Sequence, residues 1–157
     1  MKIFKILPFL VVVLLGLVAC SSDDNGDTNL INSDVIGIWD LVEVNISSAQ
    51  DMNNDGTSST NLLDEVDCIT GTLLIDGDLV WTLEQSIINI TTITGGQFFA
   101  DCSGTSSTTG GWSANETLVS FSGDQAPNPF NIINGQLVHQ IGEDLPGIQS
   151  HVYALRP

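Results

Sequence analysis

The chain has 157 residues, of which 19 are acidic and three basic, and its formal net charge is −16 at pH 7. A chain with so few cations cannot neutralise phosphates, which excludes nucleic-acid binding and an electrostatic attachment to anionic lipid. Hydrophobic residues make up 42% of the sequence, enough at this length for the core of one domain.

Residues 1–19 have the pattern of a secretory signal peptide. Lys2 and Lys5 precede an apolar run, 6–18, which ends in small residues before Cys20. That run is shorter than the roughly 17–25 residues that a membrane-spanning helix needs, so we expect cleavage instead. Cleavage would leave all 19 acidic residues and one basic residue, a net charge of about −18.

The cleavage site carries a second signal. Leu17-Val18-Ala19-Cys20 resembles the lipobox of bacterial lipoproteins. The resemblance implies that Cys20 becomes an acylated N-terminus and anchors the protein to a membrane, which several acyl chains make stable. The alternative is an ordinary signal peptide whose cleavage site happens to precede a cysteine.

Residues 20–34 begin as a polar, acidic stretch without apolar periodicity, and we expect a flexible tether there. The acidic residues Asp23 and Asp24, which follow two serines, resemble the sorting signal on surface-exposed lipoproteins of some Gram-negative bacteria. This resemblance implies an outer-membrane lipoprotein of the cell envelope, with exposure at the cell surface as a further hypothesis.

With Cys20 assigned to lipid, Cys68 and Cys102 remain as an even pair in an oxidising compartment. A disulfide between them would close a loop of about 35 residues and stabilise the fold by roughly 3–4 kcal/mol. The alternative is a reactive thiol, but no basic residue lies near either cysteine in the sequence.

From residue 35 onward, short β-branched and alternating runs predict strands. These runs are 36–46, 69–75, 78–84, 87–94, 97–101, 110–113, 117–121, 130–133, 136–141 and 151–155. Asp76-Gly77 and Asn134-Gly135 indicate hairpin turns. The only helical signal is a short turn over 61–65, capped by Ser59 or Thr60.

The absence of a long amphipathic helix excludes folds built on crossover helices. Taking 51–65 and 101–110 as loops leaves roughly 100 residues in the region 35–157, which corresponds to about eight strands with their turns. Eight antiparallel strands either close into an up-and-down barrel or stack as a β-sandwich, and composition does not distinguish the two.

Gly37-Ile38-Trp39 at the first strand resembles the Gly-x-Trp signature of lipocalins and lipocalin-like bacterial domains. The hairpin 73–81 and the segment 111–118 look like recurring features of the same bacterial group. The resemblance implies an all-β, antiparallel, eight-stranded lipocalin-like barrel over residues 35–157 that holds a small apolar ligand. The long segment 51–65 departs from the family pattern. A barrel of eight strands is wide enough for one small ligand or is filled by side chains.

The same resemblance implies that Trp39 closes the base of the barrel and that Arg156 packs across its ring. A guanidinium over an indole is favourable by roughly 0.5–2 kcal/mol. The alternative is a frayed terminus, because Arg156 is the penultimate residue.

The segment 51–65 contains the start of a calcium loop. Oxygen-bearing side chains alternate and a glycine follows, with Glu65 further along as a candidate bidentate ligand. The candidate ligands are Asp51, Asn53, Asp55, Thr57 and Glu65. The alternative is an acidic surface loop whose Asn, Asp and Gly residues serve turn formation alone. Calcium is the only cofactor that the sequence suggests.

Several aromatic and histidine side chains on predicted strands are candidates for lining a ligand cavity, although such residues are more often core. They are Trp81, Trp112, Phe121, His139 and Tyr153. His151 shares a strand face with Tyr153. No Gly-x-Ser-x-Gly elbow or zinc-ligand spacing occurs, so we expect no enzyme. Two functions remain: a ligand-binding module, or an accessory lipoprotein with a filled barrel that acts through protein contacts.

Overall fold

The computed structural model describes residues 32–127, 129–142 and 147–157. The predicted signal peptide, Cys20 and the tether as far as residue 31 lie outside the described residues. In the part of the chain that is described, no helix is both long and apolar enough to cross a membrane.

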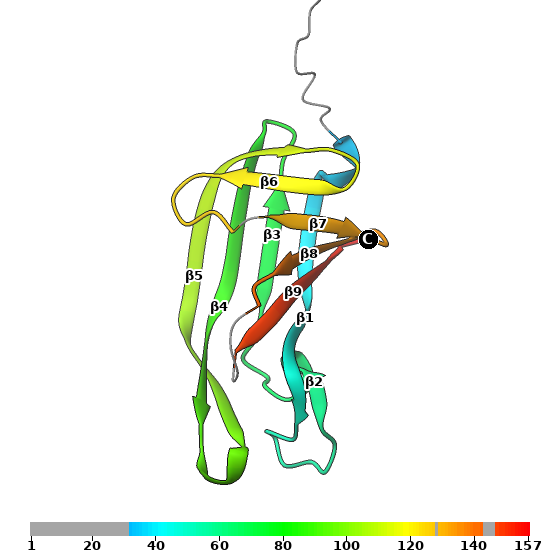
Figure 1. The fold of residues 1–157 in the computed structure, drawn as a ribbon. Coiled ribbons are helices and arrows are strands. Elements are labelled where there is room, and N and C mark those ends of the chain that lie inside the picture. Colours follow the sequence, from blue (N-terminus) through cyan, green and yellow to red (C-terminus); the bar gives the residue numbers. More distant parts are fainter. Residues whose placement is uncertain (1–31, 128, 143–146) are drawn as a thin grey trace, which may run out of the picture.

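Nine antiparallel strands form one sheet in the order β2-β1-β3-β4-β5-β6-β7-β8-β9 (Figure 1). Their bounds are β1 Gly37–Gln50, β2 Ser59–Asn61, β3 Gly71–Ile75, β4 Val80–Thr92, β5 Phe98–Ala114, β6 Leu118–Ser122, β7 Phe130–Ile133, β8 Gln136–Gln140 and β9 Ile148–Leu155. Pairing of β9 with β1 closes the sheet into an eight-stranded up-and-down barrel, with β2 as an additional strand on the far end of β1. The predicted barrel is therefore confirmed, and the β-sandwich alternative is excluded.

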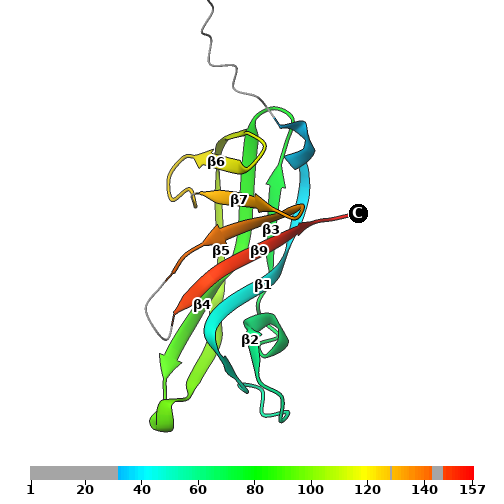
Figure 2. The same cartoon turned by 45° about the vertical axis from the view of Figure 1, so that its right-hand side comes forward.

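The closure depends on the length of β1. Its first residues pair with β3, and its last residues pair with β2. Between them β1 pairs with β9, from Trp39 opposite Leu155 to Ile46 opposite Ile148. Two register shifts along β9 bend β1 around the barrel. Strands β6–β9 cross in front of β3 and the long strands β4 and β5, and the β4–β5 hairpin extends beyond them (Figures 1 and 2).

Two strand predictions need correction. The runs 78–84 and 87–94 belong to a single strand, β4, and the predicted loop 101–110 lies inside β5. Ser, Thr and Gly residues dominate 103–111 and resemble a loop in composition. Pairing with β4 continues through them from Phe98 to Gly111, with one register shift beside Ile87, so tertiary pairing overrides their low intrinsic preference.

The two predicted hairpin turns occur where expected. Asn134 and Gly135 both have positive φ, 51° and 77°, which matches a two-residue type I′ turn. Between β3 and β4 the Asp76 carboxylate accepts the N–H groups of Asp78 and Val80, at 3.0 and 2.9 Å. The side chain forms the turn itself.

The predicted helical turn is a 3-10 helix over Leu62–Asp64. Its N-cap is Asn61, whose side-chain oxygen accepts the N–H of Leu63 at 3.2 Å. The predicted caps, Ser59 and Thr60, lie in β2 instead, because this stretch pairs with β1 before the helix begins.

The core fills the end of the barrel at which the described chain starts. Leu73, Ile75, Trp81, Leu137 and Tyr153 have no exposed surface there. They come from β3, β4, β8 and β9, so the inward faces of strands from all sides of the barrel meet at this closed end. Their complete burial means that this part of the interior has no room for a ligand.

Candidate functional site

Four of the five predicted cavity-lining residues belong to the closed end. The Trp81 and Phe121 rings lie 4.9 Å apart between centroids, and the Phe130 ring connects Phe121, at 5.1 Å, to the fully buried Tyr153, at 5.7 Å. The indole N–H groups have partners, since Trp81 donates to the Ser122 carbonyl at 3.1 Å and Trp112 to the Asp76 carbonyl at 2.9 Å. These four side chains belong to the core and line none of the four hollows at Met52, Asn54, Leu74 and His151.

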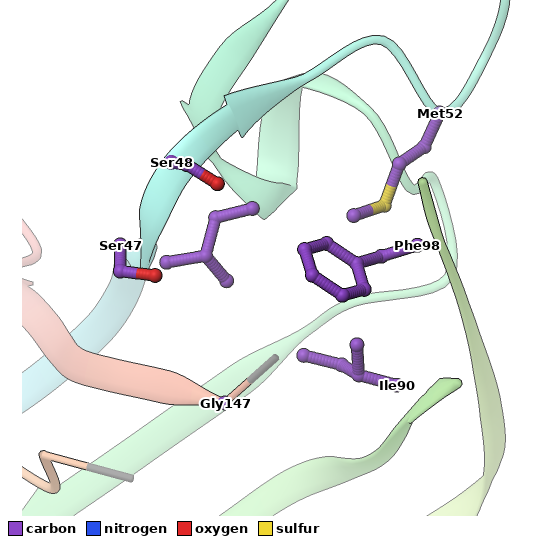
Figure 3. A pocket seen from close by; sticks show the side chains of 7 residues that line it. Ser47, Ser48, Met52, Ile90, Phe98 and Gly147 are labelled. Carbon is purple, nitrogen blue, oxygen red and sulfur yellow. The ribbon is translucent and has the colours of Figure 1, made fainter. Parts of the chain in front are cut away.

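The opposite end of the barrel is also plugged along its axis. Figure 3 shows Met52, Ile90 and Phe98 pointing toward one another from the 51–58 loop, β4 and β5. Together with Ile46 they leave a space of about 10 Å³, which is the size of a single water probe. The interior is therefore not reached through this end.

One hollow lies in the side of the barrel. Strand β5 pairs with β6 only over Gly111–Ala114, so among the described strands its lower part is paired with β4 alone. A hollow of about 290 Å³ opens there. Its walls are Gln85, Ser86, Ile87, Ile88, Ser106, Ile141, Ile148 and His151. This volume lies close to the lower limit of small-molecule sites, roughly 300 Å³.

His151 is the polar group that distinguishes this hollow. The residue is 7% exposed, and its Nε2 is a buried atom without a hydrogen-bond partner in the described structure. It is placed by strand alternation, because His151 shares the inward face of β9 with Tyr153 and pairs across with Val44 on β1. Buried polar atoms are nearly always hydrogen-bonded, so this nitrogen is an exception among the described residues, and its burial keeps it out of contact with the open space of the hollow.

A second histidine, His139, favours the neutral form of His151. His139 lies opposite on β8, with ring centroids 6.3 Å apart. Burial, and secondarily His139, lowers the pKa of His151 to about 4, and burial also lowers the pKa of His139. Both imidazoles are therefore uncharged near neutral pH. His139, the fifth predicted lining residue, stacks on Phe130 at 4.9 Å and is not a wall of the hollow.

A hydrogen bond across the interior forms the inner boundary of the hollow. The Tyr153 hydroxyl donates to the Gln85 side-chain oxygen at 2.8 Å, which connects β9 to β4. Gln85 lines the hollow, whereas Tyr153 belongs to the core. No described residue in the walls carries a charge, and four of the eight are isoleucines. The site therefore suits an apolar body with few polar groups.

The predicted calcium loop is held by its own hydrogen bonds. The Asp51 carboxylate accepts the N–H groups of Asp55 and Gly56 at 3.1 and 3.0 Å, and Glu65 accepts the N–H of Met52 at 2.9 Å. The Asn53 side-chain oxygen accepts the N–H of Asp55 at 2.9 Å. The structure thus brings these side chains to one loop. Within residues 32–127, 129–142 and 147–157, no group of three or more His, Cys, Asp or Glu is placed to hold a metal.

The predicted ligand Thr57 contributes its backbone to the same loop. Its N–H donates to the Asp55 carboxylate at 2.7 Å. A second hollow, of about 320 Å³, lies between this loop and the tip of the β4–β5 hairpin, where Ile93 and Phe99 are exposed. Among the described residues, its walls contain no buried polar atom that lacks a partner.

The side-chain partner of Arg156 is Asp40 rather than Trp39. The Arg156 Nε donates to Asp40 Oδ2 at 2.8 Å, and the pair lies on the outer face of the barrel. Trp39 points inward, is 3% exposed and donates its indole N–H to the Val35 carbonyl at 2.9 Å. Alternation along β1 separates the two, because adjacent residues of a strand face opposite sides. The backbone of Arg156 still contributes to the pairing of β9 with β1, because its N–H donates to the Ile38 carbonyl at 2.8 Å.

The predicted disulfide is confirmed. Cys68 and Cys102 are bonded, with Cα atoms 6.1 Å apart. The bond joins the segment before β3 to the lower part of β5, next to the register shift between β4 and β5. It therefore fixes the half of β5 that lacks a second neighbouring strand and borders the hollow.

Comparison of the chain with protein-family models, with curated proteins and with solved structures found no match. Inferences about function therefore depend on the geometry described above.

The sequence indicated the inward orientation of one residue that lines the hollow, His151, but not that of its polar neighbours. Alternation with Tyr153 placed His151 inside the barrel. Gln85, Ser86 and Ser106 are polar residues in strands, which is usual for solvent-facing positions. Their inward position follows from a change of face in β4 after Gln85 and from the single pairing of lower β5, neither of which sequence alternation shows.

Proposed function

We propose that this protein is a non-catalytic lipoprotein of the cell envelope, anchored by acyl chains on Cys20, whose lipocalin-like barrel binds a small apolar ligand. The observation that supports it is the hollow of about 290 Å³ in the side of the closed barrel, half of whose eight lining residues are isoleucines. The closed barrel and its disulfide give the site a rigid frame, and the disulfide fits an oxidising compartment.

The tether would enter the barrel at its filled end. Asn32 donates from its backbone to the Ala114 carbonyl at 3.4 Å and from its side chain to the Asn115 carbonyl at 3.2 Å. In Figure 1 this point lies at the opposite end from the β4–β5 hairpin tip. An anchor on Cys20 would therefore hold the filled end nearest to the membrane and leave the side hollow accessible.

Lipidation is tested by growing producing cells with an alkyne-tagged fatty acid. We expect the tag on the intact chain and its loss in Cys20→Ser. Protease treatment of intact cells then tests exposure at the surface. Tag incorporation that persists in Cys20→Ser would contradict the anchor at this residue.

Ligand binding is tested on the full chain carrying Cys20→Ser, which remains free of acyl chains. We expect mass spectrometry of an organic extract to find a small apolar molecule that co-purifies with it. Ile148→Trp, which fills the hollow, should remove that molecule, whereas Ile133→Trp at an exposed turn should not. An empty extract, or equal recovery from both variants, would favour the alternative of an accessory lipoprotein that acts through protein contacts.

A further inference from the structure

We propose that the second hollow, between the 51–58 loop and the tip of the β4–β5 hairpin, binds a neutral saccharide. This rim hollow has a volume of about 320 Å³ and lies at the end of the barrel opposite the point where the described chain starts (Figure 1). The residues that line it fall within 49–58 and 93–99, which the structure describes throughout. The rim hollow is separate from the side hollow, so this inference does not depend on the apolar ligand proposed for that site.

Half of the wall of the rim hollow is polar, and most of its polar groups are free to bind a ligand. The polar residues that line it are Gln50, Asp51, Asn54, Ser58 and Gln97. Within the described structure the side chains of Gln50, Ser58 and Gln97 make no hydrogen bond. The Asp51 carboxylate accepts two backbone N–H groups of its own loop and keeps further lone pairs.

These free groups complement several hydroxyl groups at once. An amide side chain both donates and accepts hydrogen bonds, and a carboxylate accepts them. The adjacent hydroxyls of a sugar ring also donate and accept, so a single sugar offers partners to two or more of these side chains. A hydrocarbon would displace water from the amides without replacing its hydrogen bonds, which is unfavourable.

The other half of the wall is apolar and includes an exposed aromatic ring. Phe99 is 52% exposed and Ile93 is 47% exposed. The C–H groups of a sugar ring carry a small positive charge, because their carbons are bonded to oxygen, and the face of an aromatic ring is negative. A sugar therefore packs well on an aromatic ring. An exposed phenyl ring beside free amides suits a sugar better than it suits a wholly apolar molecule.

The charges around the rim hollow favour a neutral ligand. The described residues that line it include no lysine, arginine or histidine, and Asp51 is the charged residue among them. An anion would find no counter-ion there, and the net charge of −16 repels it at longer range. In the described part of the chain no group of three or more His, Cys, Asp or Glu is placed to hold a metal ion. A neutral polyhydroxyl compound avoids both difficulties.

Both walls of the rim hollow are fixed by the protein itself. On one side the Glu65 carboxylate accepts the N–H of Met52 at 2.9 Å, which holds the start of the loop. On the other side the Ile93 N–H donates to the Gln97 carbonyl at 2.9 Å and closes the hairpin tip. Fixed walls reduce the entropy lost on binding. The volume lies at the lower end of small-molecule sites and suits roughly one or two sugar rings.

The test starts from an array of neutral saccharides printed beside counterparts that carry a carboxylate or a sulfate. The full chain with Cys20→Ser is labelled with a fluorophore at its amino groups, which are those of Lys2, Lys5 and the N-terminus, outside the described residues. We expect binding to neutral saccharides and not to their anionic counterparts. Titration calorimetry then gives the affinity for the saccharide that binds best.

Two substitutions locate the binding. Phe99→Ala should weaken it at least about tenfold, and Gln97→Ala should weaken it roughly fivefold to tenfold. Ile133→Ala is the matched control for the first, because Ile133 is 45% exposed but lies at the β7–β8 turn. Gln140→Ala is the control for the second, because Gln140 is an exposed glutamine at the end of β8 that does not line the rim hollow. Both controls should keep the affinity of the parent chain.

A measurement without any substitution protects the test against a misfolded variant. In a ¹H–¹⁵N spectrum the side-chain amide signals of Gln50 and Gln97 should shift when the saccharide is added, whereas that of Gln140 should stay in place. Failure of every saccharide on the array to bind would overturn this inference, and so would preferential binding of the anionic counterparts or an unchanged affinity in Phe99→Ala. Each of these results would leave the proposed function of the side hollow standing.

Discussion

The Tyr153 hydroxyl on β9 donates a 2.8 Å hydrogen bond to the side-chain oxygen of Gln85 on β4, across the interior of the barrel. On one side of this bond lie the packed rings of the closed end, and on the other lies the hollow that Gln85 lines. Burial raises the pKa of Tyr153, so its phenol keeps the proton that it donates. The pair thus separates the filled part of the barrel from the open part.

Tyr153→Phe removes that donor and leaves the Gln85 amide half-buried without its partner. We expect a loss of about 1–2 kcal/mol in the free energy of unfolding, measured by urea denaturation. Adding Gln85→Leu to this variant removes the unpaired amide as well and should recover part of the loss. Strictly additive effects of the two substitutions would contradict an interaction between the side chains.

The disulfide gives a second stability prediction. Reduction of Cys68–Cys102 releases a loop with a sequence separation of 34 residues, for which the chain-entropy relation gives about 3–4 kcal/mol. We expect the melting temperature to fall by roughly 10 °C or more in dithiothreitol. The double variant Cys68→Ala/Cys102→Ala should melt at the lower temperature with or without the reductant. A variant that still responds to dithiothreitol would show that the reductant acts elsewhere.

The barrel could be predicted because its signals are local. Asn134-Gly135 specifies its hairpin through positive φ values that few other residues adopt, and the alternation around Trp39 specifies which face of β1 is buried. Closure of β9 on β1 followed from the strand count together with the resemblance. These features depend on short stretches of chain, which a sequence displays directly.

The site could not be predicted because it depends on how far strands that are distant in the sequence pair with one another. Ser106 lies in the part of β5 that β6 does not reach, because β6 is five residues long and pairs only with Gly111–Ala114. The predicted lining residue Phe121 is core because Trp81 and Phe130 reach it from β4 and β7. Strand alternation gives the face of a residue, but its depth along the barrel depends on register and relative length.

The loop 51–65 can be tested by removal of divalent metal. The carboxylates of Asp51 and Glu65 already accept backbone N–H groups, so we expect the same melting temperature in EDTA and in millimolar calcium. A calcium site occupied at a hundred times its dissociation constant would add about 2.7 kcal/mol and raise the melting temperature by roughly 10 °C. A rise of that size, abolished by Asp55→Ala, would establish the calcium site instead.

Arg156 gives a test of the outer ion pair. The hydrogen bond from Arg156 lowers the pKa of the Asp40 carboxyl. Both side chains are exposed, and ion pairs on the surface contribute little to stability. We expect Arg156→Ala to change the melting temperature only slightly and the tryptophan emission spectrum not at all, because the Trp39 indole is buried on the other face. Asp40→Ala is the matched control and should give the same result. A red shift of the emission in Arg156→Ala alone would indicate a guanidinium–indole contact.

Because His151 is buried, we expect the free energy of unfolding to decrease as the pH is lowered. The pKa of this residue is about 4 in the folded protein, against 6.5 for an unperturbed histidine. Between these values the unfolded chain binds a proton that the native protein does not, so stability falls as the pH is lowered from about 6.5 to about 4. Above about 6.5 both states are neutral, and His151 contributes no dependence.

At about pH 4.5 this linkage costs roughly 2 to 3 kcal/mol relative to neutral pH, and His139, the titratable group that faces His151, adds a change of the same sign. Surface carboxylates titrate in the same range, and protonating them relieves the repulsion within this acidic chain. The measurement is therefore a difference: urea unfolding of the wild type and of His151→Phe at neutral pH and at about pH 4.5. We expect the wild type to lose roughly 2 to 3 kcal/mol more than the variant, because the variant lacks the more deeply buried of the two imidazoles. Parallel losses would mean that the ring of His151 is as accessible to protons in the native barrel as in the unfolded chain, and would contradict its burial.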